Sequence, residues 1–211
     1  MTRAVLHAGL QQIGVSLDAE RQDHLIAYRD LLHKWNRSFN LTAVRDPDEM
    51  VVLHLLDSLA VLPYLDHADG LQAIDIGTGG GLPGIPLAIA RPRQHWVLLD
   101  SNHKKGSFLR QVAAELRLPN VEVVVKRIED FAPLPRLDLA ISRAFSSLEA
   151  FVAAAMRVLK PVGRMFAMKG VPPHEEIESL RARGYALEVI PIPVPGLDAQ
   201  RCLISVECSP S

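Results

Sequence analysis

The sequence predicts an α/β protein: an open sheet of seven mostly parallel strands, preceded by a helical extension. Three observations support this fold class. Apolar residues recur at three- and four-residue steps over residues 18–63, as in amphipathic helices. From Ala73 onward, short apolar runs alternate with helical patterns, and a glycine-rich loop follows the first run. The 211 residues are enough for one domain of good size.

The N-terminal segment is expected to be helical. An apolar stripe is formed by Leu25, Tyr28, Leu31, Leu32, Trp35 and Phe39. A second helix is predicted over Met50–Leu62, after the start signal Asp46-Pro47. We expect residues 1–66 to form an extension that packs on a core of residues 67–211, in one compact unit.

The remaining elements follow in alternation. The predicted strands are Ala73–Ile76, Trp96–Asp100, Val121–Lys126, Leu137–Ser142, Gly163–Lys169, Tyr185–Ile190 and Arg201–Val206. The predicted helices are Pro86–Ala90, Lys104–Arg117, Leu148–Leu159 and His174–Arg183. Several strands are apolar throughout, which is typical of a parallel sheet covered on both faces. Only a proline-rich link joins the last two strands, which predicts an antiparallel hairpin at the sheet edge.

Composition limits the class of protein. Hydrophobic residues make up 48% and charged residues 22%, with a net charge of -1, as in an ordinary globular protein. No global basic field exists, so a nucleic-acid partner needs a local basic face. Basic residues gather at Arg91, Arg93, Lys104, Lys105 and Arg110.

No leader, membrane or metal signal is present in the sequence. The N-terminus lacks the apolar region of a signal peptide, and no apolar run approaches the ~18 residues that span a bilayer. Cys202 and Cys208 lie six residues apart in one predicted strand, too far for a disulfide, and are expected to be reduced. The eight histidines show no metal-binding pair. We therefore expect a cytoplasmic protein without a metal.

The loop after the first strand is a candidate nucleotide site. Asp75 ends the strand, and Gly77, Gly79 and Gly81 follow at alternate positions. Asp100 ends the second strand, where a carboxylate can accept hydrogen bonds from both hydroxyls of a ribose. This suits NAD as well as S-adenosylmethionine. Asp75 favours S-adenosylmethionine, because a carboxylate suits a methionine ammonium better than a pyrophosphate. An NAD-linked oxidoreductase remains the alternative.

Three further strand tips carry candidate site residues. Ile128 and Glu129 follow the third strand. There Ile128 could pack on an adenine, and Glu129 could accept a hydrogen bond from the exocyclic amine of the adenine. Arg143 ends the fourth strand and Lys169 the fifth, on the same rim. Seven strands with a terminal antiparallel hairpin are the layout of class I methyltransferases. The fourth tip lacks the Asn/Asp-Pro-Pro-Tyr/Phe motif of amino-group methylases, and no cysteine lies near for cytosine C5 methylation.

The chain resembles the ribosomal small-subunit methyltransferase G family (RsmG, also called GidB) over about residues 17–206. The resemblance is carried by the following segments: Trp35–Thr42, His54–Ser58, Asp75–Leu87, Leu99–Ser101, Phe108–Arg110, Ile141–Phe145 and Lys169-Gly170. Gly80 stands where many relatives have proline. The resemblance implies methyl transfer from S-adenosylmethionine to N7 of a guanine in the 530 loop of 16S rRNA. It also implies that Gly77, Leu82, Ile128, Glu129 and Arg143 contact the cofactor.

Guanine N7 carries an in-plane lone pair, so its methylation needs no general base, and none is evident. We assign Asp100 to the ribose, Asp75 to the methionine end of the cofactor or to loop geometry, and Arg143 and Lys169 to catalysis at the rim. The expected partner is 16S rRNA or a small-subunit particle, bound by a monomer. Free rRNA, the 30S subunit and an assembly intermediate stay open as substrates. A binding module without catalysis is the rival of another class.

Overall fold

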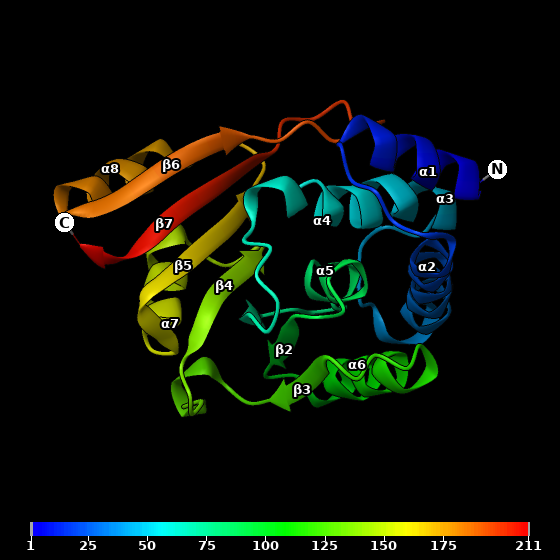
Figure 1. The fold of residues 1–211 in the computed structure, drawn as a ribbon, viewed down its shortest axis with the longest axis horizontal. Coiled ribbons are helices and arrows are strands. Elements are labelled where there is room, and N and C mark those ends of the chain that lie inside the picture. Colours follow the sequence, from blue (N-terminus) through cyan, green and yellow to red (C-terminus); the bar gives the residue numbers. More distant parts are fainter. Residues whose placement is uncertain (1, 211) are drawn as a thin grey trace.

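Seven strands form one sheet in the order β3-β2-β1-β4-β5-β7-β6 (Figure 1). A computed structural model describes the backbone of residues 2–210 and the side chains of residues 2–207. The strands are β1 (Gln72–Ile76), β2 (His95–Asp100), β3 (Val121–Val125), β4 (Leu137–Arg143), β5 (Leu159–Lys169), β6 (Tyr185–Pro191) and β7 (Cys202–Pro210). β1 to β5 pair in parallel, and β7 is antiparallel to both of its neighbours. The predicted fold class and its edge hairpin are confirmed.

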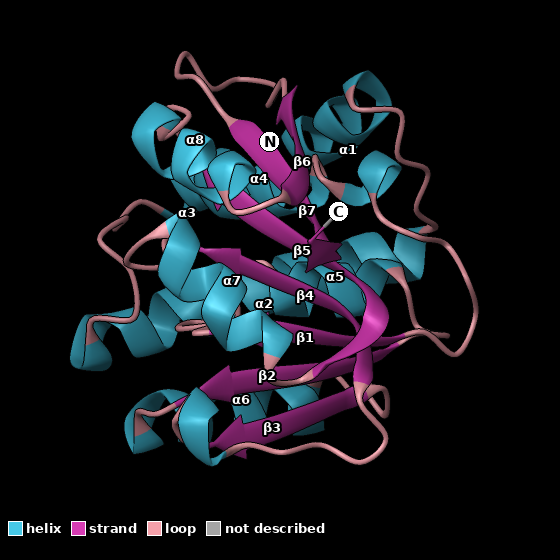
Figure 2. Cartoon of the chain, turned by 90° about the vertical axis from the view of Figure 1, so that its left-hand side faces the viewer, coloured by secondary structure: helices cyan, strands magenta, loops and turns pink. Residues whose placement is uncertain are grey.

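Helices cover both faces of the sheet (Figure 2). One core lies under α2 (Ala19–Phe39), α5 (Gly84–Ala90) and α6 (His103–Glu115), and the other lies under α7 (Leu148–Met156) and α8 (His174–Ala182). Neighbouring strand residues alternate between the cores: Ala73 points into the first and Ile74 into the second. Because both faces are buried, the strands are apolar throughout.

The helical extension is more irregular than its sequence pattern predicts. Its elements are α1 (Thr2–Gln12), α2, α3 (Pro47–Met50), the π-helix η1 (Val51–Leu56), α4 (Asp57–Leu59) and the 3-10 turn η2 (Leu62–Tyr64). The apolar stripe did not predict α1, which buries Leu6 and Leu10. The continuous helix predicted over residues 50–62 is interrupted, because a π-helical turn occupies its first half. Single π turns occur often at functional sites.

Three boundaries predicted after Ala73 are wrong by three residues or more. The helix predicted to reach Leu159 ends at Met156, and β5 begins at Leu159, four residues earlier than predicted. The last strand runs to Pro210, four residues beyond its predicted end. Cys202 is a buried free cysteine, and the side chain of Cys208 lies outside the described residues. Within the described part of the chain, no helix is long and apolar enough to cross a bilayer.

The extension packs on the sheet next to the glycine-rich loop. Tyr28 is fully buried in the first core, and its hydroxyl donates a 2.7 Å hydrogen bond to the carbonyl of Gly80. The ring of Trp35 lies 5.5 Å from that of Phe108 on α6. Burial raises the pKa of Tyr28 far above its ordinary value, so the hydroxyl remains a donor. Residue 66 as the boundary of the extension stays a prediction.

Tyr28→Phe should destabilise the protein by about 1–3 kcal/mol, because it leaves the buried Gly80 carbonyl without its donor. Urea unfolding at pH 7 measures the change. Tyr64→Phe is the matched control, since Tyr64 is 38% exposed, and it should stay within about 0.5 kcal/mol of wild type. Equal effects of the two substitutions would mean that the Tyr28 hydroxyl does not hold the loop.

Candidate functional site

The glycines of the loop after β1 divide into two pairs. Gly77 and Gly79 have φ angles of 72° and 61°, which favour glycine. A Cβ at Gly79 would meet nothing nearer than the Gly77 oxygen, at 4.0 Å, and one at Gly77 only the Phe145 ring, at 3.9 Å. Their backbone is therefore open to a ligand. Gly80 and Gly81 are packing positions instead, because a Cβ would lie 3.1 Å from Leu32 at Gly80 and 2.6 Å from Ile85 at Gly81.

Asp75 lies beneath this loop and is fully buried. Its Oδ2 accepts hydrogen bonds from the Thr78 hydroxyl at 2.6 Å and the Gly84 amide at 2.8 Å. Burial raises its pKa to about 6, against the effect of these two donors. Of the two roles considered for Asp75, this geometry supports the shaping of the loop. Leu82 is also buried, with 5% of its surface exposed, so its role at the site is to pack beneath the loop.

Asp100 ends β2 directly beside the open glycines. Its Oδ2 accepts from the Gly79 amide at 3.0 Å, and its Oδ1 accepts from the Asn102 amide at 2.9 Å. Lys105 lies 3.3 Å from Oδ2. A carboxylate has about four acceptor positions, so Asp100 retains capacity for a ligand hydroxyl.

The residues predicted after β3 lie at the neighbouring strand tip. Ile128 and Glu129 begin the 3-10 turn η3 (Ile128–Asp130). Ile128 is 9% exposed, whereas Glu129 is exposed and accepts a hydrogen bond from Arg157 only through its backbone carbonyl. β3 and β2 are neighbours, with a strand spacing of about 4.8 Å. The structure thus brings the predicted cofactor residues to one edge of the sheet.

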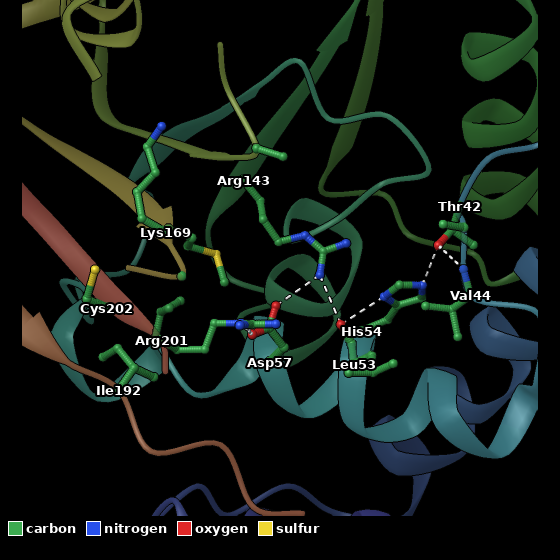
Figure 3. Close-up of a pocket in the computed structure, with 15 residues that line it drawn as sticks. Thr42, Val44, Leu53, His54, Asp57, Arg143, Lys169, Ile192, Arg201 and Cys202 are labelled. Atoms are coloured by element: carbon green, nitrogen blue, oxygen red, sulfur yellow. Dashed lines mark hydrogen bonds and ion pairs between the residues drawn. The ribbon is translucent and has the colours of Figure 1, made fainter. Parts of the chain in front are cut away.

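Arg143, at the end of β4, belongs to a buried ion-pair cluster that the sequence did not predict (Figure 3). Its Nη1 donates to Asp57 Oδ2 at 3.0 Å and to the Leu53 carbonyl at 3.1 Å. Arg201 Nε donates to Asp57 Oδ1 at 2.8 Å. The Asp57 side chain is 3% exposed. We call Asp57 with Arg143 and Arg201 the Asp57 clamp.

His54 lies beside the clamp, within the π-helix η1. Its Nδ1 lies 2.8 Å from the Leu53 carbonyl and its Nε2 lies 2.8 Å from the Thr42 hydroxyl. A carbonyl can only accept, so Nδ1 carries the proton and Nε2 accepts from Thr42. Burial and the nearby Arg143 guanidinium lower the pKa of His54 to about 4. His54 is therefore neutral at pH 7.

A cavity of about 500 Å³ opens where the extension meets the tips of β4, β5 and β7. It is lined by Thr42, Ala43, Val44, Leu53, His54, Asp57, Val61, Arg143, Ala144, Met168, Lys169, Gly170, Ile192, Arg201 and Cys202. Both residues predicted to be catalytic, Arg143 and Lys169, lie in this wall. The Lys169 ammonium donates to the Phe145 carbonyl at 3.3 Å. None of the loop glycines lines the cavity. The predicted cofactor-binding residues therefore lie at the loop, and the predicted catalytic residues lie in the cavity beside it.

Sequence reasoning assigned no role to Asp57, His54 or Arg201. Asp57 and His54 lie in a segment that carried the family resemblance, which was the one available signal. Arg201 stands at the start of the last predicted strand and carried no comparable signal.

An open sheet with the strand order β3-β2-β1-β4-β5-β7-β6, in which β7 is antiparallel to both neighbours, is the class I S-adenosylmethionine-dependent methyltransferase fold. A solved structure described as a SAM dependent methyltransferase from Aquifex aeolicus shares it. The TM-score is 0.59 at 19% sequence identity, covering 85% of this chain and 98% of that one.

The particular family follows from sequence comparison. A family model described as GidB, rRNA small subunit methyltransferase G, matches residues 21–204. The chain is 50% identical to a ribosomal RNA small subunit methyltransferase G from Chromobacterium violaceum over 202 residues, 95% of each chain. It is 48% identical to one from Pseudomonas aeruginosa over 204 residues, 97% of this chain and 94% of that one. The protein belongs to the rRNA small subunit methyltransferase G family, which confirms the predicted family and removes the oxidoreductase alternative.

His54→Asn should change the pH dependence of stability. Between pH ~6.5 and ~4 the unfolded histidine of the wild type binds a proton that the folded one, with its pKa of about 4, does not. On acidification through this window the wild type should therefore lose about 3 kcal/mol of unfolding free energy relative to the variant. Asp75 titrates in the same range with the opposite sign, but it is present in both proteins.

Urea unfolding from pH 7 to pH 4 measures this difference. His174→Asn, at an exposed position on α8, is the control and should run parallel to wild type. Parallel curves for wild type and His54→Asn would show that His54 is not held neutral by its surroundings.

Proposed function

We propose that the protein transfers a methyl group from S-adenosylmethionine to N7 of a guanine in the 530 loop of 16S rRNA. The observation that carries the proposal is one arrangement at the edge of the sheet. The open backbone of Gly77 and Gly79 lies beside Asp100 and adjoins a cavity lined by Arg143 and Lys169. A cofactor site next to a substrate site is what methyl transfer requires.

The residues at the tips of β1 to β3 fit the cofactor. No side chain blocks the backbone at Gly79, and Asp75 Oδ1 is a buried oxygen that makes no hydrogen bond with any described residue. When bound, S-adenosylmethionine supplies a methyl group on a positively charged sulfur. Asp100 would accept from its ribose hydroxyls, and Ile128 and Glu129 would pack on its adenine and accept from the amine.

Three other residues predicted to bind the cofactor would instead shape the loop or pack against it. Asp75 holds the loop from below, and Gly81 and Leu82 fill the space between the loop and α5. Arg143 lines the cavity at the tip of β4, the strand beside β1, so it lies between the two parts of the site.

The side chains at the rim position and hold the reactants. Guanine N7 already carries its lone pair, so the chain needs no group that removes a proton before attack. An arginine that bound O6 and N7 together would cover the reacting atom. Arg143 is therefore assigned to a phosphate, to O6 alone or to the cofactor carboxylate, and Lys169 to the RNA.

The proposed substrate also indicates the compartment and the binding partners of the protein. The protein would act in the cytoplasm on rRNA or a small-subunit particle, as a monomer that binds neither a membrane nor a metal. Among the described residues, no cluster of histidine, cysteine and acidic side chains could hold a metal ion. A net charge of -1 means that the RNA must be met by local basic residues around the site.

The proposal is tested on small subunits from cells that lack this protein. Incubation with labelled S-adenosylmethionine should transfer about one methyl group per particle, and chemical cleavage at N7-methylguanine should place it in the 530 loop. Labelling of another base, or of another guanine, would overturn the proposal.

Asp100→Ala should weaken cofactor binding. Loss of even one hydrogen bond to the charged carboxylate costs about 1.5–3 kcal/mol, which is roughly a 10- to 150-fold rise in Kd. Calorimetric titration with S-adenosylmethionine measures it, with Glu178→Ala on the exposed face of α8 as the control. An unchanged Kd in Asp100→Ala would remove Asp100 from the cofactor site.

A further inference from the structure

We propose that the cavity beside the Asp57 clamp receives the target guanine after it flips out of its RNA, and that Arg201 reads the O6 atom of the base. The inference rests on the proposed function and deepens it. It assigns a substrate pocket and a specificity-determining residue, Arg201, to the chain.

The cavity lies where a base would meet the cofactor. Arg143 and Ala144 line its wall, and the next residue, Phe145, has its ring 3.9 Å from the place of a Cβ on Gly77. The cavity and the open loop therefore adjoin at the stretch that follows β4. The reacting edge of a base in the cavity would lie beside this stretch, in direct contact with the methyl group of a cofactor on the loop.

The size and walls of the cavity suit a planar base. Its volume of about 500 Å³ lies in the range of small-molecule sites, about 300–1,000 Å³. Much of the wall is apolar, with Val44, Leu53, Val61, Met168 and Ile192. Such walls suit the faces of a base better than a hydrated phosphate. Enzymes that modify a base commonly take it out of the stack into a pocket of this kind.

The side chains of the wall that can accept hydrogen bonds already do so. Both carboxylate oxygens of Asp57 accept from arginines, and the side chain is 3% exposed. His54 Nε2 accepts from the Thr42 hydroxyl, and that hydroxyl accepts from the Val44 amide. Each of these acceptor side chains therefore already has a donor, and the charged groups that the wall offers to a ligand are Arg143, Arg201 and Lys169.

A donor-rich wall selects guanine over adenine at the edge that reacts. On this edge guanine presents two acceptors, O6 and N7, whereas adenine presents N7 beside an amino group that donates. Cationic donors would repel that amino group and leave it unpaired. The chemistry of the wall thus favours guanine over adenine.

Arg201 is a donor of this wall whose guanidinium is held in one orientation. Its guanidinium is fixed at two nitrogens, with Nε on Asp57 at 2.8 Å and Nη1 on the Gln200 carbonyl at 2.9 Å. Its Nη2 makes no hydrogen bond with any described residue. The Lys169 ammonium donates to the Phe145 carbonyl. In Figure 3 its side chain points away from the clamp. A single donor on O6 leaves N7 free for the methyl group.

The wild-type protein gives the first test, through rRNA with one replaced base at the target position. Such rRNA is used free and in reconstituted small subunits. Inosine keeps O6 and N7, whereas 2-aminopurine keeps N7 but lacks O6. We expect kcat/KM for inosine to stay within about threefold of guanine, and kcat/KM for 2-aminopurine to fall about 10- to 100-fold. Equal rates for guanine and 2-aminopurine would overturn the inference, although methylation of guanine N7 would still stand.

Arg201→Gln gives the second test. It should lower kcat/KM for guanine about 10- to 100-fold and leave the already low value for 2-aminopurine within about threefold, so that discrimination disappears. Arg181→Gln, at an exposed position on α8, is the matched control and should keep the discrimination. Calorimetry with S-adenosylmethionine should show a Kd within about threefold of wild type for both variants.

Two outcomes would contradict the role of Arg201. An equal fall for guanine and 2-aminopurine would mean that Arg201 binds a phosphate, and a loss of cofactor affinity would place it on the cofactor. If Arg201→Gln does not fold, Arg201→Lys keeps the charge beside Asp57 but lacks the fork, and it should show reduced discrimination. Undiminished discrimination in folded Arg201→Lys would overturn the assignment.

Discussion

The Asp57 clamp joins three segments that are distant in sequence. Asp57 pairs with Arg143, 86 residues later, and with Arg201, 144 residues later. A buried carboxylate is tolerated only when it is paired and hydrogen-bonded, so each member of the clamp fixes the others. Asp57 is the first residue of α4, Arg143 is the last residue of β4, and Arg201 directly precedes β7. The wall of the cavity is therefore a single unit, and the extension is part of it.

The glycine-rich loop is held in a comparable way from several sides. Beneath the loop, Asp75 accepts a hydrogen bond from the Gly84 amide. Asp100 accepts one from the Gly79 amide, and the Tyr28 hydroxyl of the extension donates one to the Gly80 carbonyl. These contacts fix the loop without covering Gly77 and Gly79. A site that is fixed before its ligand arrives loses little entropy on binding. The same extension thus supports the loop through α2 and the cavity through η1.

The sequence predicted what local patterns and strand topology determine. Parallel strands bring their carboxyl ends to one edge, so Asp100, Ile128 and Arg143 were expected to gather, and they do. The spacing of the glycines did not show that Gly81 packs against the core, because spacing does not reveal whether a loop residue faces the ligand or the protein interior. The π turn and the pairing of Asp57 with Arg201 arise from contacts between distant segments. No residue pattern within one segment encodes them.

Arg201 follows Asp57 by 144 residues, and this separation bears on the order in which the protein assembles. Synthesis proceeds from the N-terminus, so Asp57 and the first six strands exist before Arg201 does. Until then, burying Asp57 would leave its second oxygen without a cation, and β5 would lack its antiparallel neighbour. The ion pair between Asp57 and Arg201 is thus a long-range contact that only the later part of the chain can complete. A chain that stops before residue 201 would keep the glycine-rich loop and lose one wall of the cavity.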